Sequence, residues 1–186
     1  QSSQKKMTVA SEGQFRARAL IKDLRQQKSF IVNLNFNVVR GKALRLDVSS
    51  PLSQHLATFV VTPKELSYIM IPEKTYYLGK MKDNAMAGLL PVPLNAAWLE
   101  NILFRNAFET KVWICTQGKS GMVDQCENLK EKINILWSQS ENKKPRIDVK
   151  HPSGEIQMNF HVAQSKVEAG VSLETLKAPK GFRTVR

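Results

Sequence analysis

Apolar and polar side chains alternate along most of this chain, with the period of two that is typical of strands with one buried face. The clearest example is the segment 30–38, whose asparagines alternate with Phe30, Val32, Leu34, Phe36 and Val38. Comparable runs, separated by turns that contain Gly or Pro, lie at 15–22, 44–48, 56–62, 66–71 and 75–78. They predict a meander of about six antiparallel strands. Further strands are predicted at 111–116, 122–127, 134–137, 146–150, 156–162 and 171–176.

The pattern changes in the middle of the chain, where 80–90 and 96–104 are rich in Met, Ala and Leu and favour helices, the second with Asn95 as its N-cap. A large sheet must curl, and helices inserted into a meander must cover something. We therefore predict a mainly β fold with α elements: a single curved antiparallel sheet of about 11 strands beneath a helical lid. The apolar face is then either ordinary packed core or the wall of a ligand cavity.

The segment 44–52 combines a strand with an unusual turn. Leu44, Leu46 and Val48 fall on one face of this strand, and Arg45 and Asp47 fall on the other. Two serines and a proline then stop the strand. Leu52 follows among polar residues. It either folds back onto the core or protrudes as a membrane probe, and burial of one leucine in lipid yields roughly 1.5–3 kcal/mol.

The two cysteines also fit a hairpin. A turn centred on Ser120-Gly121 places Cys115 directly opposite Cys126, at a separation that a disulfide can span. A Cys115–Cys126 disulfide is typical of an oxidising compartment such as the periplasm. The alternative is a pair of reduced cysteines, one of them buried as a small apolar residue.

The charge balance is unusual: 28 Lys and Arg stand against 16 Asp and Glu, a formal net charge of +12. Such a surface attracts nucleic acid, acidic proteins or an anionic membrane, although the charge can also serve solubility alone. No apolar run is long enough for a membrane-spanning helix, and we expect no signal peptide in this sequence. Since the chain starts without Met, we expect a processed N-terminus, with residues 1–12 as a flexible tether.

Catalytic and metal-binding signals are weak. His55, His151 and His161 are scattered and fit no metal-ligand spacing. The sequence Gly118-Lys119-Ser120 resembles the end of a phosphate-binding loop, but Trp113 stands where that loop needs its first glycine. We therefore expect no enzyme, no cofactor and no metal. The aromatic residues lie mostly on the apolar faces rather than among exposed basic residues, so we expect no nucleic-acid partner.

Two segments carry a resemblance to a known family. Residues 44–52, Leu-Arg-Leu-Asp-Val-Ser-Ser-Pro-Leu, resemble the strand and Pro-Leu-Gly turn of the outer-membrane lipoprotein receptor family LolB, within the LolA/LolB lipoprotein localisation factor superfamily. Residues 90–99, Leu-Pro-Val-Pro-Leu-Asn-Ala-Ala-Trp-Leu, resemble that family's Pro-x-Pro-Leu-Asn…Trp segment. The order of strand meander, helical insert and further strands covers most of the chain. Ser53 departs from the family pattern, since it replaces the glycine after the leucine.

The resemblance implies a half-open β-barrel, formed by residues 13–186, with a cavity that binds the acyl chains of lipoproteins. It implies a protein of Gram-negative bacteria that receives acylated lipoproteins from a LolA-like periplasmic carrier. It implies that the protein delivers them to the anionic periplasmic face of the outer membrane, with Leu52 as the membrane-insertion residue. The anchor would be an N-terminal lipidated cysteine that this chain lacks. We expect a monomer. The predicted cavity residues are Phe36, Leu46, Phe59, Ile69, Trp98, Ile102 and Phe160.

Two alternatives remain at this stage. The departures from the LolB pattern leave room for a divergent relative, including a soluble LolA-like carrier, and Arg40 weakly resembles a carrier arginine that ties the lid to the barrel. A basic, β-rich nucleic-acid-binding module is the alternative from another functional class, because it explains the charge.

Overall fold

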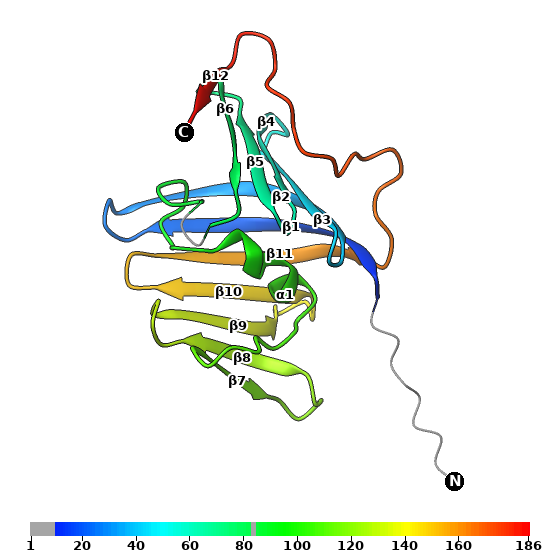
Figure 1. Cartoon of the computed structure of the whole chain (residues 1–186). Helices are drawn as coiled ribbons and strands as arrows, with labels where there is room; N and C mark the ends of the chain where they lie inside the picture. Colours follow the sequence, from blue (N-terminus) through cyan, green and yellow to red (C-terminus); the bar gives the residue numbers. More distant parts are fainter. Residues whose placement is uncertain (1–9, 83–84) are drawn as a thin grey trace.

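The computed structural model describes residues 10–82 and 85–186, which fold around one large sheet (Figure 1). The first half of the sheet is a meander of β1 (Glu12–Asp23), β2 (Lys28–Val39), β3 (Ala43–Ser49), β4 (His55–Val61), β5 (Glu65–Met70) and β6 (Thr75–Lys80). The second half comprises β7 (Trp113–Gln117), β8 (Val123–Asn128), β9 (Ile133–Gln139), β10 (Pro145–His151) and β11 (Gly154–Gln164). The last strand is β12 (Arg183–Val185).

The pairing of β1 with β11 joins the two halves into one sheet. Its 12 strands follow the order β12-β6-β5-β4-β3-β2-β1-β11-β10-β9-β8-β7, without closing into a barrel. Figure 1 shows the consequence of the curvature: β4–β6 run steeply across the direction of β8–β11. The prediction of a single curved, half-open sheet is therefore confirmed, with 12 strands in place of about 11.

The inner, concave face of the sheet carries the predicted apolar residues. Leu44 and Leu46 are buried on it, whereas Arg45 and Asp47 lie on the outer face, as the alternation predicts. The inner face is covered by the inserted segment between β6 and β7. That segment contains η1, a 3-10 helix (Ala96–Trp98), and α1 (Leu99–Leu103). We call the described residues of this segment from Met81 to Phe104 the lid.

The helix predicted at 96–104 is confirmed, and that at 80–90 is wrong. Asn95 caps the first helical turn, because its side chain accepts a hydrogen bond from the Ala97 amide at 2.9 Å. By contrast, β6 continues to Lys80, and the described residues 85–89 form turns. Gly88 adopts a positive φ of 82°, and Pro91 follows three residues later. Gly88 and Pro91 both disfavour a helix here. The Met, Ala and Leu side chains of this segment therefore pack on the sheet from turns.

The strand predicted at 171–176 is also wrong. Residues 165–182, which we call the strap, run without regular structure over the outer face of the first meander. The Glu168 amide donates to the Asn37 side chain, and the Leu176 amide donates to Ser67 Oγ. The strap then leads into β12, which pairs in parallel with β6. The alternation of apolar and polar side chains at 171–176 therefore reflects how the strap packs against the sheet, and this segment is not itself a strand.

The disulfide predicted between Cys115 and Cys126 is present. The two residues are directly paired across β7 and β8, with Cα atoms 4.1 Å apart, and Gly121 supplies a positive φ in the turn between them. The predicted tether at residues 1–12 falls mostly outside the described residues; its described end, from Ala10, leads directly into β1.

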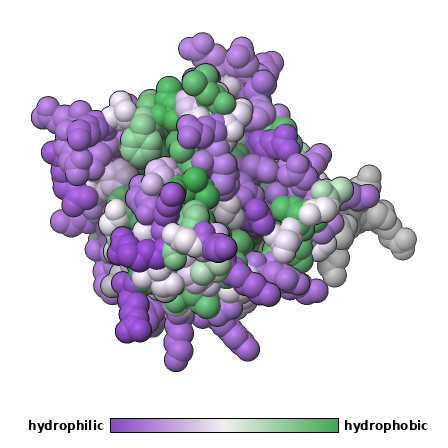
Figure 2. Space-filling model, turned by 90° about the horizontal axis from the view of Figure 1, so that it is seen from above, coloured by the Kyte–Doolittle hydropathy of each residue, from purple (hydrophilic) through white to green (hydrophobic). Residues whose placement is uncertain are grey.

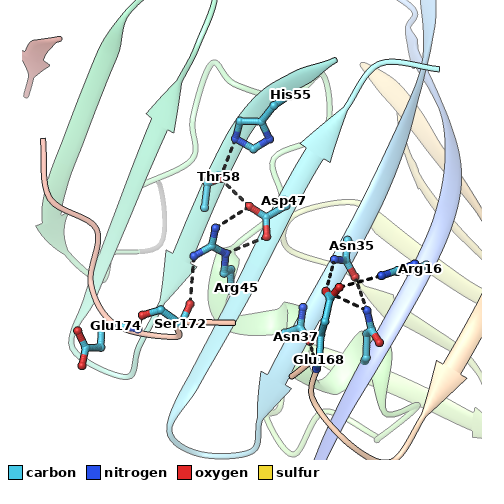
Figure 3. A network of polar contacts seen from close by, with 11 residues as sticks. Arg16, Asn35, Asn37, Arg45, Asp47, His55, Thr58, Glu168, Ser172 and Glu174 are labelled. Atoms are coloured by element: carbon cyan, nitrogen blue, oxygen red, sulfur yellow. Dashed lines mark hydrogen bonds and ion pairs between the residues drawn. The ribbon is translucent and has the colours of Figure 1, made fainter. Parts of the chain in front are cut away.

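A polar network fixes the strap to the outer face (Figure 3). Asp47 accepts two hydrogen bonds from Arg45, at 2.8 and 3.0 Å, and one from the Thr58 hydroxyl at 2.7 Å. Arg45 also donates to the Ser172 carbonyl at 3.1 Å, and Thr58 contacts His55. Burial acts to raise the pKa of Asp47, but the hydrogen bonds from Arg45 and Thr58 outweigh it, so the pKa lies below its ordinary value of 3.8.

We expect Asp47→Asn to lower the free energy of unfolding at neutral pH by about 1.5–3 kcal/mol, because it removes the charge that these hydrogen bonds stabilise. The folded-state pKa is lowered, so the stabilisation is present above the unfolded pKa of about 3.9 and is lost as pH falls through the folded value. Urea denaturation of both proteins between pH 7 and pH 2 should therefore show a difference that shrinks in acid. A constant difference across this range would contradict the role of the Asp47 charge.

Candidate ligand cavity

An apolar cavity of about 280 Å³ lies between the inner face of the sheet and the lid. All 20 residues that line it are apolar. The sheet supplies Ile21, Phe30, Val32, Leu34, Phe36, Leu46, Val48, Leu56, Ala57, Phe59, Met70, Val149, Ile156 and Met158. The lid supplies Met86, Leu89, Leu90, Leu94, Leu99 and Ile102. We call this space the main cavity.

Four of the predicted cavity residues, Phe36, Leu46, Phe59 and Ile102, line the main cavity together. Phe36 pairs with Leu46 across β2 and β3, and Leu46 pairs with Phe59 across β3 and β4. These three residues form a row across the inner face because directly paired residues share a face. Ile102 meets this row from the lid.

The other three predicted residues lie elsewhere. Ile69 pairs with Thr58 and Tyr76 on the outer face, whereas its neighbours Tyr68 and Met70 face inward. Trp98 packs edge-on against Trp113, with ring centroids 5.1 Å apart, outside the main cavity. Phe160 is buried on the inner face but lines a separate cleft beside Phe15.

Sequence reasoning missed most of the lid lining. Met86, Leu89, Leu90 and Leu94 lie in turns and irregular chain, where no period identifies the buried side. The sequence did carry a signal for two further lining residues on the sheet. Val32 and Leu34 share the face of Phe36 in the alternating run, so alternation places them on the cavity side.

The lid is held over the main cavity by contacts from α1. Glu100 accepts a hydrogen bond from Arg40 at 3.4 Å and another from the Gly41 amide at 3.2 Å. The Arg40 guanidinium also lies 4.7 Å from the centre of the Phe104 ring, a cation–π distance. On the other side of α1, the Trp137 indole donates to the Ile102 carbonyl at 2.9 Å. These contacts tie the lid to both halves of the sheet.

The main cavity reaches the surface near the hairpin that joins β1 and β2. Phe30 lines the cavity and is still 48% exposed, so it marks an opening. Leu52 is 93% exposed at the tip of the β3–β4 turn. Ser53 adopts a φ of 64°, a conformation that glycine adopts without strain. Figure 2 shows apolar patches among hydrophilic groups on one face of the molecule.

None of the described residues that line the main cavity is charged. Tyr68 is a titratable residue beside Phe59 on the inner face, and the centroids of the two rings lie 5.5 Å apart. Burial, followed by the neighbouring Tyr77, raises the pKa of Tyr68, so its hydroxyl stays neutral at physiological pH. Within residues 10–82 and 85–186, no three His, Cys, Asp or Glu side chains are grouped to hold a metal ion.

Two solved structures share this fold. The LolA superfamily protein of Nitrosomonas europaea superposes with a TM-score of 0.51 at 6% sequence identity, over 83% of this chain and 86% of that chain. A structure described as an outer membrane lipoprotein-sorting protein domain, from Vibrio parahaemolyticus, superposes with a TM-score of 0.50 at 8% identity, over 87% of each chain. At such identities the likeness shows a LolA-like fold and no more.

No protein-family model and no curated protein sequence matches this chain. Among the described residues, no helix has the length and apolar character needed to cross a bilayer.

We expect Glu100→Gln to loosen the lid, because the ion pair with Arg40 is lost while the side chain keeps its size. A partly exposed ion pair contributes about 0.5–1 kcal/mol, so hydrogen exchange of the α1 amides should accelerate roughly 2–5-fold. Glu109→Gln, an exposed change in the same inserted segment, is the matched control. Equal exchange rates in α1 for the two variants would show that Glu100 does not secure the lid.

Proposed function

We propose that this protein binds the acyl chains of lipoproteins in the main cavity and delivers them to the outer membrane, as a receptor of the LolB type. The observation that carries the proposal is the lining: 20 residues, every one apolar, beneath a lid held by a few contacts. A site of this kind can bury hydrocarbon, and it offers no side chain for polar recognition or catalysis.

The energetics favour an acyl chain as the ligand. Each buried methylene contributes about 0.8 kcal/mol, so even ten of them offer on the order of 8 kcal/mol before the costs of binding. The volume of the main cavity, about 280 Å³, lies just below the range of about 300–1,000 Å³ that is typical of pockets for drug-sized ligands. Entry of a lipoprotein therefore requires the lid to move, and the contacts of Glu100 and Trp137 are those that must loosen.

The surface of the protein supports membrane delivery. Leu52 stands free of the core at a turn tip, and the net charge of +12 favours contact with anionic lipid. One leucine and a few basic residues give a weak, reversible contact, and stable anchoring takes a lipid modification as well. We propose a lipidated cysteine upstream of Gln1 for that role, and a LolA-like periplasmic carrier as the donor of cargo.

A soluble LolA-like carrier is the competing proposal, and the shared fold supports it equally. The exposure of Leu52 favours the receptor, because a carrier that only exchanges cargo with proteins has no need of a membrane-contacting leucine. The two proposals therefore differ in what they require of this residue.

We expect Ala57→Phe to abolish acyl-chain binding by filling the main cavity, which Ala57 lines from β4. Binding of palmitic acid, measured by isothermal titration calorimetry, should weaken at least tenfold. Ala97→Phe makes the same change at an exposed position of η1 and should bind as the wild type does. Thermal unfolding shows whether both variants fold. Tight binding by a folded Ala57→Phe variant would place the ligand elsewhere.

We expect Leu52→Glu to retain lipoprotein binding and to impair transfer of the lipoprotein to liposomes of outer-membrane lipid composition. The carboxylate makes insertion unfavourable while leaving the main cavity unchanged. Ile114→Glu, at a 52% exposed position on edge strand β7, is the control and should transfer normally. Normal transfer by Leu52→Glu would favour the carrier over the receptor.

A further inference from the structure

A surface cleft of about 580 Å³ lies between the lid and the strands β7 and β8. Trp98, Phe108 and Trp113 line it, and we call it the Trp98 cleft. Leu94 lines both this cleft and the main cavity, so one stretch of the lid divides the two spaces. Seven of the 14 residues that line the Trp98 cleft are polar or charged, whereas all 20 that line the main cavity are apolar. The Trp98 cleft therefore suits a different class of ligand.

Three aromatic rings form the apolar part of the Trp98 cleft. The Phe108 and Trp113 rings are stacked, with centroids 4.1 Å apart and planes inclined by 12°. The Trp98 ring stands nearly perpendicular to this pair, 5.1 Å from Trp113 and 6.4 Å from Phe108 between centroids. Trp98 and Phe108 are half-buried, so part of each ring remains open to a ligand. Because each ring packs against the other two, this aromatic wall is formed before a ligand binds.

Asn128 places a hydrogen-bond donor without a partner in the Trp98 cleft. The residue pairs with Trp113 across β7 and β8 and is only 1% exposed. Its Oδ1 accepts a hydrogen bond from the Glu131 amide at 2.9 Å, whereas its NH₂ group donates to none of the described residues. Protein does not enclose this NH₂ group, since Asn37 is the described residue that buries such an atom. The group is therefore open to the cleft, where an acceptor on a ligand would satisfy it.

The Trp98 cleft also offers hydrogen-bond acceptors. Glu109 and Glu131 line it, and neither carboxylate forms an ion pair within the part of the chain that the structure describes. Asn101 donates its NH₂ group to the Ala107 carbonyl at 3.4 Å, which leaves its Oδ1 as an acceptor. Lys130 adds a donor. The ligand must therefore both donate and accept hydrogen bonds.

These features exclude several classes of ligand. Hydrocarbon would leave the polar half of the lining without partners. An anion would meet two carboxylates and one ammonium group, in a protein that offers excess positive charge elsewhere. An ammonium ion suits the rings and the carboxylates, but it has no acceptor for Asn128.

A saccharide fits all parts of the lining. Each of its hydroxyl groups both donates and accepts a hydrogen bond, and the C–H faces of its rings are apolar enough to pack on aromatic side chains. The volume of about 580 Å³ lies within the range of about 300–1,000 Å³ that is typical of small-molecule sites.

We propose that the Trp98 cleft binds a neutral oligosaccharide. Its sugar rings pack against Trp98 and Phe108, and its hydroxyl groups accept from Asn128 and donate to Glu109 and Glu131. This activity is separate from the binding of acyl chains and does not depend on whether the protein is a receptor or a carrier.

Tryptophan fluorescence of the whole protein tests the proposal. Trp98 and Trp113 line the cleft, whereas the remaining tryptophan, Trp137, lies outside it. We expect saturable changes in emission when the protein is titrated with at least one of maltotriose, cellotriose and chitotriose, and isothermal titration calorimetry should give the same affinity. Absence of binding to all three oligosaccharides would overturn the proposal.

An Asn128→Asp variant tests the donor. The change removes the NH₂ group and keeps an oxygen for the Glu131 amide, and we expect the affinity for the oligosaccharide to fall at least tenfold. Asn134→Asp is the matched control, because Asn134 accepts a hydrogen bond from Gln125 at 3.2 Å in the same way and lies outside the cleft. This control should bind as the wild type does. Equal affinities of the two folded variants would place the saccharide elsewhere.

A Trp98→Leu variant tests the aromatic wall without touching Asn128. It keeps apolar bulk and removes the flat ring, so we again expect at least a tenfold loss of affinity for the oligosaccharide. Thermal unfolding shows whether each variant folds. A parallel titration uses choline, a quaternary ammonium ion. Choline that binds more tightly than every oligosaccharide, with the same affinity in Asn128→Asp, would show that the cleft is a cation site and overturn the proposal.

The outcome is independent of the proposed function. Palmitic acid should bind to Asn128→Asp as it binds to the wild type, because Asn128 does not line the main cavity. Saccharide binding without palmitic acid binding would leave this inference intact and overturn only the proposed function, and the reverse result would overturn only the inference.

Discussion

The whole structure depends on how a short inserted segment covers a wide apolar face. Pairing of β1 with β11 fuses two meanders into one curved sheet, and the inner face of that sheet carries most of the buried apolar side chains of the described residues. The cover available is α1, five residues long, together with η1 and irregular chain. Such a cover cannot fill the concavity to the density of a normal core, and apolar space remains beneath it. The main cavity follows from this mismatch between sheet and lid.

The lid is held by a few specific contacts at its helical end. Arg40 and Gly41 hold Glu100 from the first meander, and Trp137 holds the Ile102 carbonyl from the second half of the sheet. Contacts of this number are weak compared with the burial of an acyl chain. A lipid can therefore displace the lid, and the apolar side chains that it uncovers can pack on the bound chain.

Sequence reasoning could predict what alternation alone determines. The inward row of Phe36, Leu46 and Phe59 follows from the period of two, and the cysteine pair follows from one turn. The prediction that Ile69 faces the cavity is wrong. Strand β5 is short and has apolar residues on both faces, so alternation alone does not show which face is turned inward. The helix expected at 80–90 and the strand expected at 171–176 failed for a shared reason: both segments pack on the sheet, and composition does not distinguish packing on a sheet from regular structure. The cleft that Phe160 lines had no signal in the sequence, since residues from six separated parts of the chain form it.

An open sheet of this size has two free borders, and each border tends to recruit strands from neighbouring molecules. Strand β7 forms one border. It is only five residues long, its pairing with β8 shifts register at Thr116, and the Cys115–Cys126 disulfide ties it to its neighbour. At the other border, β12 covers Thr75–Tyr77 of β6 with a piece of the same chain. The strap that delivers β12 is therefore also a barrier to polymerisation: it lets the protein keep its barrel half open for a ligand without adding copy after copy along the sheet.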